Sequence, residues 1–191
     1  ICVHMNKETN KRFEQFCEDI TQNNSHDKFF KEVMSNSEVA RQFCEVHIPK
    51  EILEKADLSK LKQEKTMMLN SMLQEKIMDV VYSLPINGKK AYITILVEHQ
   101  STVDKNMIFR IHEYIMAISR AHMSENQNDE FPVVYPIIFY TGLQKYTATN
   151  KIWELYQDPV IMKSVFIDGP KIIDVARMDD DEHREMTQYC V

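Results

Sequence analysis

The chain has 191 residues, of which 43% are hydrophobic and 27% charged, the balance of an ordinary globular domain. Only three glycines are present, which argues against collagen-like, glycine-linker and glycine-rich phosphate-loop proteins. No apolar run reaches the roughly 18–20 residues that a membrane-spanning helix needs. The net charge of −6 argues against a nucleic-acid partner, because such proteins usually carry a basic surface, although a local patch can outweigh the total.

The four cysteines are far apart and form no CxxC pair. This spacing argues against a zinc site and against a secreted disulfide framework. Cys44 stands among apolar residues and is interpreted as a small buried side chain. No signal-peptide pattern is present, so we expect a cytoplasmic protein that does not contact a membrane.

We expect a single principal domain. Residues 1–25 are polar, with a short apolar stripe at helical spacing, and are predicted to be an N-terminal helical extension. The domain itself is predicted over 26–178. Residues 179–191 read as the start of a C-terminal helix that the end of the chain truncates.

The first third of the domain is predicted to be mainly helical. Apolar positions follow helical spacing over 26–47, with a break at 35–37 that divides the stretch into two helices. A short helix follows over 50–55, then a polar connection over 62–65. An edge strand is predicted over 66–69.

The centre of the sequence predicts a β-hairpin. A strand over 77–84 is followed by Asn87-Gly88, which is a strong two-residue turn signal. The next strand, over 91–97, is nearly all apolar and rich in β-branched residues. Such a strand is typical of the middle of a sheet, buried on both faces.

The remaining elements complete a mixed α/β domain. A long amphipathic helix is predicted over 107–122, then a strand over 133–140 in which Pro136 favours an edge or a bulge. Trp153 and Leu155 are expected to anchor a loop or a short helix. A last strand is predicted over 165–167.

Two carboxylates stand out in this hairpin. Asp79 interrupts an apolar strand, and Glu98 ends the most hydrophobic strand in the chain. Asp79 lies eight residues before Asn87 and Glu98 ten after Gly88, so the turn can bring both to one end of the hairpin. Gln100 shares a side with Glu98 in an extended chain.

Such a set of oxygen ligands suits a divalent cation. Mg²⁺ commonly takes one or two carboxylates and completes its shell with water and substrate phosphate. There it would activate a phosphodiester for hydrolysis, with Gln100 orienting the water or a phosphate. The alternative, which composition and spacing leave open, is that both acids are strand-end residues that face water or pair with lysines.

Several segments resemble the Rpn, or YhgA-like, family of recombination-promoting nucleases and transposase-like proteins. This family belongs to the PD-(D/E)XK nuclease superfamily. The similarity covers about residues 26–178. It rests on the run His26-Asp27-Lys28-Phe29-Phe30-Lys31-Glu32-Val33, on Val97-Glu98-His99-Gln100-Ser101-Thr102, on an Asp before the hairpin, and on the later Pro136-Ile137-Ile138-Phe139-Tyr140-Thr141-Gly142.

The resemblance implies a restriction-endonuclease-like core, in which a mixed β-sheet is flanked by helices. By similarity, Asp79 corresponds to the motif's aspartate, Glu98 to its second acid, and Gln100 to the position that is lysine in most of the superfamily. Glu32 resembles an additional metal ligand of some members, or is an exposed helix residue. Lys28 and Arg110 are weaker candidates for contacts with substrate phosphate.

The predicted function is therefore metal-dependent hydrolysis of DNA phosphodiesters, associated with recombination or mobile elements. The implied cofactor is Mg²⁺ or Mn²⁺ and the implied partner is DNA. The sequence does not determine the oligomeric state, and a dimer is one of the alternatives. The alternative is a catalytically weak or inactive module on the same fold that binds DNA or protein.

Overall fold

The computed structural model describes residues 26–64, 79–98, 103–126, 130–142 and 144–174. The chain divides into two compact units, Ile1–Ala148 and Thr149–Val191. The helix predicted within 1–25, the strand at 66–69 and the helix predicted from 179 lie outside the described residues. The domain limits 26–178 therefore remain a prediction.

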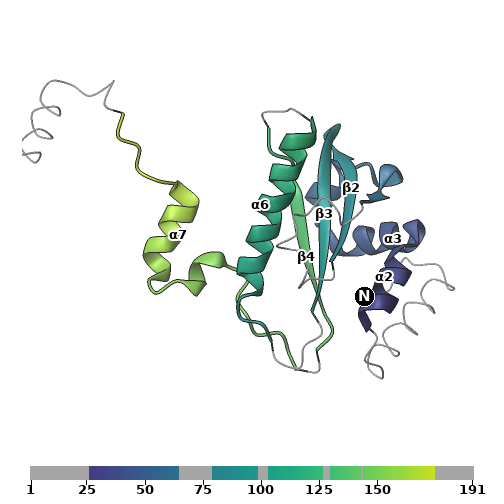
Figure 1. The fold of residues 1–191 in the computed structure, drawn as a ribbon, viewed down its shortest axis with the longest axis horizontal. Coiled ribbons are helices and arrows are strands. Elements are labelled where there is room, and N and C mark those ends of the chain that lie inside the picture. Colours follow the sequence, from purple (N-terminus) through teal and green to yellow (C-terminus); the bar gives the residue numbers. More distant parts are fainter. Residues whose placement is uncertain (1–25, 65–78, 99–102, 127–129, 143, 175–191) are drawn as a thin grey trace, which may run out of the picture. The chain divides into compact units, whose positions relative to one another are not determined.

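The first unit contains a four-stranded mixed sheet (Figure 1). Its order is β1-β2-β3-β4, with antiparallel pairing from β1 to β3 and parallel pairing between β3 and β4. A parallel pair needs a long crossover, and helix α6 (Met107–Asn126) provides it. The strands are β1 (Lys62–Gln63), β2 (Asp79–Ile86), β3 (Lys89–Glu98) and β4 (Val134–Tyr140).

Helices α2 (His26–Met34) and α3 (Ser37–His47) confirm the predicted division of the first helical stretch. The break has a local cause, because the side chain of Asn36 accepts hydrogen bonds from the backbone N–H groups of Glu38 and Val39 and so caps α3. The short helix α4 (Lys50–Leu53) and the 3-10 turn η1 (Leu58–Lys60) lead into β1. β1 lies where the sequence predicted only a polar connection.

The two faces of the sheet are covered by different helices. One face packs on α2 and α3, and we call it the α2/α3 face. The opposite face lies along α6, where the Tyr92 hydroxyl meets Nδ1 of His122 at 3.1 Å, and we call it the α6 face (Figure 1). The core of the α2/α3 face includes Phe30, Met34, Ala40, Phe43, Cys44, Val80, Tyr82, Leu84, Ile93 and Ile95.

Cys44 confirms its interpretation as a buried apolar residue. It is fully buried within the core of the α2/α3 face. Burial raises the pKa of its thiol to about 12, which keeps it in the unreactive protonated form at neutral pH. Pro136 is also accommodated as expected, because β4 is an edge strand within the described part of the sheet.

The second unit corrects one prediction. Residues 165–167 do not form a strand but lie in helix α7 (Pro159–Asp168). Asp158 caps this helix by accepting hydrogen bonds from the N–H groups of Val160 and Ile161, and Pro159 occupies its first turn, where its missing N–H is not needed. These start signals outweigh the β-branched residues. The 3-10 turn η3 (Ile152–Leu155) precedes α7, as expected for the segment around Trp153.

The mixed sheet with helices on both faces confirms the predicted α/β class. No helix in the described ranges combines the length and the apolar character needed to cross a membrane.

Candidate active site

The turn between β2 and β3 sets the register of the hairpin. Asn87 and Gly88 both have positive φ values, 50° and 75°, which is the conformation of the tight turns that match strand twist. With this turn, Asp79 pairs with Leu96. The hairpin predicted from Asn87-Gly88 is therefore confirmed.

This register places the two acids on one face of the sheet. Paired residues share a face, and so do residues two apart along a strand. Because Asp79 pairs with Leu96, and Glu98 follows Leu96 by two residues, all three positions belong to the α6 face. Asp79 and Glu98 are thus diagonal neighbours, for which Cα–Cα separations of about 7–8 Å are usual.

The other predicted residues are placed less favourably. Gln100 lies outside the described residues, and only the backbone of Lys28 is described, within α2. Glu32 is exposed on α2, a helix that packs on the α2/α3 face through Phe30 and Met34. The register thus gives Glu32 no geometric link to the acid pair, and its role as a ligand stays a prediction.

Arg110 lies in the first turn of α6, close to a carboxylate of its own segment. Its Nη1 is 2.8 Å from Oδ2 of Asp104, and both side chains are about a quarter exposed or less. The other oxygen of Asp104 accepts a hydrogen bond from the N–H of Asn106 at 2.8 Å. Arg110 is therefore held at the start of α6 by an ion pair, and a contact with phosphate there stays a prediction.

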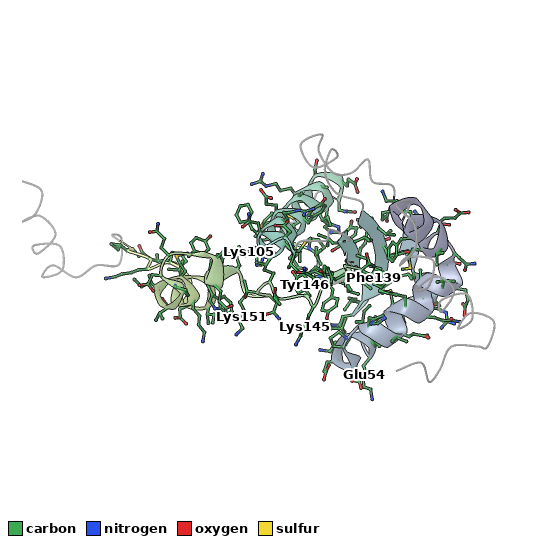
Figure 2. All side chains as sticks on the ribbon, turned by 90° about the horizontal axis from the view of Figure 1, so that it is seen from below. Glu54, Lys105, Phe139, Lys145, Tyr146 and Lys151 are labelled. Atoms are coloured by element: carbon green, nitrogen blue, oxygen red, sulfur yellow. The ribbon has the colours of Figure 1, made fainter. Side chains whose placement is uncertain are left out.

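Exposed lysines flank the end of the sheet where β3 and β4 finish. Figure 2 views this end and labels Lys105, in the turn before α6, and Lys145, in the loop after β4. Both side chains are exposed. No signal in the sequence pointed to Lys145, because this residue is far along the chain from the hairpin.

A tyrosine that sequence reasoning also missed stands next to Glu98. Tyr140 ends β4 and is the register partner of Glu98 in the parallel pair, so it belongs to the α6 face. Its ring packs edge-on against Tyr146, with 5.2 Å between the ring centroids. Its hydroxyl oxygen is buried and makes no hydrogen bond to the residues that the structure describes.

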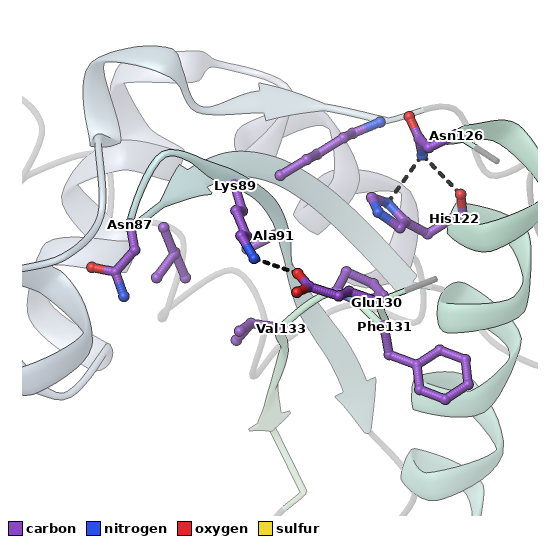
Figure 3. Close-up of a pocket in the computed structure, with 11 residues that line it drawn as sticks. Asn87, Lys89, Ala91, His122, Asn126, Glu130, Phe131 and Val133 are labelled. Atoms are coloured by element: carbon purple, nitrogen blue, oxygen red, sulfur yellow. Dashed lines mark hydrogen bonds and ion pairs between the residues drawn. The ribbon is translucent and has the colours of Figure 1, made fainter. Parts of the chain in front are cut away.

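The hairpin-turn end of the sheet, far from the acids along β3, carries a second polar cluster. It borders a pocket of about 630 Å³ (Figure 3). Lys89 at its rim is ion-paired with Glu130. His122 is 6% exposed and lies near both the Tyr92 hydroxyl and the side-chain amide of Asn126. These polar groups satisfy one another, which is what a structural cluster requires.

Among the described residues, no group of three or more His, Cys, Asp or Glu side chains is arranged to hold a metal ion. The side chains of Asp79 and Glu98 lie outside that description, so a two-carboxylate site at these positions stays a prediction. Two carboxylates are the number that Mg²⁺ commonly takes from a protein. The mixed sheet with helices on both faces agrees with the restriction-endonuclease-like α/β core that the sequence resemblance implies.

The comparison with known families agrees with this class. Residues 24–191 match the family described as "Putative transposase, YhgA-like", and the chain belongs to that family. The resemblance seen in its sequence motifs is confirmed. No solved structure matches the chain.

Curated relatives carry nuclease names. The chain is 33% identical over 158 residues to "Recombination-promoting nuclease RpnC" of Escherichia coli (strain K12), covering 82% of this chain and 52% of that protein. It is 29% identical over 164 residues to "Recombination-promoting nuclease RpnD" of Escherichia coli O157:H7, covering 85% and 63%. It is also 30% identical over 163 residues to "Inactive recombination-promoting nuclease-like protein RpnE" of strain K12, covering 85% and 54%. The chain thus spans little more than half the length of these relatives.

Proposed function

We propose that this chain carries the nuclease domain of a metal-dependent DNA endonuclease that acts in recombination or on mobile elements. The observation that supports this most directly is the register of the hairpin, which sets Asp79 and Glu98 on one face of the sheet. The nuclease names of the relatives RpnC and RpnD support the same reaction.

The donor chemistry at these positions fits a hard divalent cation. Carboxylate oxygens are the protein ligands that Mg²⁺ and Mn²⁺ prefer, and a pair of them leaves positions for water and a phosphate oxygen. Asp79 and Glu98 would hold the ion. When bound, it would neutralise charge on the phosphate and favour the ionised form of a water molecule.

The remaining roles belong to side chains of the chain itself. In hydrolysis, the oxygen of a water molecule bonds to phosphorus, the bond to one ester oxygen breaks, and a proton reaches that oxygen as it leaves. Gln100 would orient the water or a phosphate oxygen through its amide. Arg110 and Lys28 would contribute positive charge toward the DNA backbone, and Glu32 would assist as a further ligand.

A second candidate function has a specific observation in its favour. Two relatives, RpnE and the 34% identical YjiP of strain K12, are named as inactive or putative inactive nuclease-like proteins. The family therefore includes proteins whose names describe them as inactive. In that case, this chain would bind DNA or protein without cutting.

The deciding experiment is a nicking assay on supercoiled DNA with Mg²⁺. We expect the unmodified chain to nick the plasmid and both Asp79→Asn and Glu98→Gln to lower the rate about a hundredfold or more. Each change removes a charged ligand whose ion supplies several kcal/mol of charge stabilisation. Calorimetric titration with Mn²⁺ would check the ligand role independently, with weaker binding expected for both variants.

Glu113→Gln is the matched control, because Glu113 is an exposed carboxylate on α6 and loses the same charge. It should nick DNA like the unmodified chain. Equal rates for all four proteins would refute the nuclease function. DNA binding without nicking by any of them would establish the binding-module alternative.

A further inference from the structure

Tyr140, the register partner of Glu98, carries an unusual polar group. Its hydroxyl oxygen is buried, yet no described residue hydrogen-bonds to it. A buried hydroxyl without a partner is unfavourable and is rare in folded proteins. The position therefore calls for a partner from outside the described chain.

The backbone places Tyr140 at the end of the sheet where a ligand would bind. Tyr140 is the last residue of β4 and pairs with Glu98, the last residue of β3. Ligands of α/β sheets bind outside the carboxyl ends of parallel strands. Since Asp79 shares the α6 face with this pair, a substrate held by the two acids would lie beside Tyr140.

The absence of a side chain at Gly142 leaves room for the ring of Tyr140. A Cβ atom at this glycine would collide with the hydroxyl oxygen and Cζ of Tyr140 and would lie 2.7 Å from its Cε2. The ring therefore lies directly over the backbone of Gly142, just beyond the end of β4. Its edge-on contact with Tyr146 supports it from a second direction.

Another buried hydroxyl shows that a missing hydrogen-bond partner does not by itself indicate a ligand-binding position. Oγ1 of Thr94 also has no partner within the described residues. Thr94, however, is fully buried as a residue in the middle of β3. Tyr140 differs because it is only half-buried as a residue and ends its strand as the register partner of Glu98.

We propose that the Tyr140 hydroxyl binds the substrate, donating a hydrogen bond to a non-bridging oxygen of the DNA phosphate held at Asp79 and Glu98. The inference rests on the proposed nuclease function and names a further substrate-binding residue for it. A phenol suits this role because it donates without adding charge and its ring is already fixed, so that little freedom is lost on binding.

The test is Tyr140→Phe, which removes only the hydroxyl. We expect KM for DNA cleavage to rise about tenfold with kcat nearly unchanged, as for a lost hydrogen bond to a charged group. Fluorescence anisotropy with a labelled duplex and Ca²⁺ in place of Mg²⁺ should show a similar loss of affinity. The melting temperature should not fall, because the hydroxyl has no internal partner to lose.

Two further variants sharpen the result. Gly142→Ala keeps the hydroxyl but forces the ring aside, so it should weaken DNA binding as Tyr140→Phe does, and the double variant should be no weaker than either single one. Tyr135→Phe is the matched control. It makes the same change on the same strand, but Tyr135 packs against the core of the α2/α3 face and should leave DNA binding unchanged.

The outcomes separate the two proposals. If Glu98→Gln cleaves DNA normally, the proposed function fails whatever Tyr140→Phe does. If Glu98→Gln is inactive while Tyr140→Phe keeps the KM and DNA affinity of the unmodified chain, only the role of Tyr140 is overturned. A lower melting temperature for Tyr140→Phe would likewise overturn it, because the hydroxyl would then have an internal partner.

Discussion

At the scale of single residues, Tyr82 shows how the core combines an apolar body with one directed polar contact. Its side chain is among the most deeply buried, and its hydroxyl donates a hydrogen bond of 2.6 Å to the backbone carbonyl of Met34. That carbonyl lies in the last turn of α2, where no further helical N–H is available to it. Burial raises the pKa of Tyr82 above its usual value, so it remains a donor.

We predict that Tyr82→Phe lowers the free energy of unfolding by about 1–3 kcal/mol, because a buried carbonyl would be left without its donor. Urea denaturation followed by circular dichroism would measure this. Tyr135→Phe, on the neighbouring part of the same face, should cost much less, since no hydrogen bond from its hydroxyl to a described residue is present. Equal stability of Tyr82→Phe and the unmodified chain would contradict the prediction.

At the scale of elements, the attachment of the edge strand β1 to the sheet depends on the side chain of Glu64. It has only two residues, so it contributes few backbone bonds. Glu64 follows it, donating its N–H to the carbonyl of Val81 at 2.8 Å and accepting a hydrogen bond from Ser83 at 2.6 Å. Nζ of Lys90 lies 3.4 Å from the same carboxylate. Glu64 thus fastens β1 to the central hairpin.

This attachment predicts a pH dependence. Burial acts to raise the pKa of Glu64. The hydrogen bond from Ser83 and the charge of Lys90 together lower the pKa by more than burial raises it, so the pKa lies below its usual value. A carboxylate with a lowered folded-state pKa stabilises the fold above its unfolded pKa of about 4.3, and this stabilisation is lost as the pH falls through the folded value.

Glu64→Gln should therefore lower the free energy of unfolding by about 1 kcal/mol at pH 7 and flatten its decline below about pH 4. Urea denaturation across this pH range is the measurement. Glu54→Gln is a suitable control, because Glu54 is an exposed carboxylate just after α4. A variant with the same acid dependence as the unmodified chain would show that Glu64 does not contribute as described.

At the scale of the whole molecule, the net charge of −6 opposes the approach of DNA. The metal site proposed at Asp79 and Glu98 would add to this repulsion until cations neutralise it. The exposed Lys105 and Lys145, at the end of the sheet where β3 and β4 finish (Figure 2), are placed to offset it locally. Binding should therefore be weak and should depend on both divalent cations and salt.

We predict that DNA affinity in Ca²⁺ falls about tenfold between 50 and 200 mM KCl, which corresponds to roughly two neutralised phosphates. Replacing Lys105 or Lys145 by alanine should reduce the slope of log affinity against log salt by roughly 0.9 each. Lys50→Ala, at the start of α4, should leave the slope unchanged. Fluorescence anisotropy measures all three, and a salt-independent affinity would contradict this electrostatic account.

The sequence determined the features that depend on neighbouring residues. Asn87-Gly88 specifies a tight turn, and the two-residue period of the strands then settles which positions share a face. Asp79 and Glu98 could therefore be placed together from the sequence alone. The same local logic found the break before α3, but it gave a strand instead of α7, because the start signals at Asp158 and Pro159 were not weighed against the β-branched residues.

Only the tertiary structure decided what lies beside the acids. Tyr140 is adjacent to Glu98 because β4 pairs in parallel with β3. The long crossover through α6 separates these two strands in the chain, so no turn residue specifies their register. Glu64 likewise meets Ser83 and Lys90 only because β1 joins the sheet. Net charge shows the same difference. Composition determines the total of −6, whereas the fold determines where the lysines and acids lie. Their placement matters because electrostatic forces on DNA act over only roughly 10 Å.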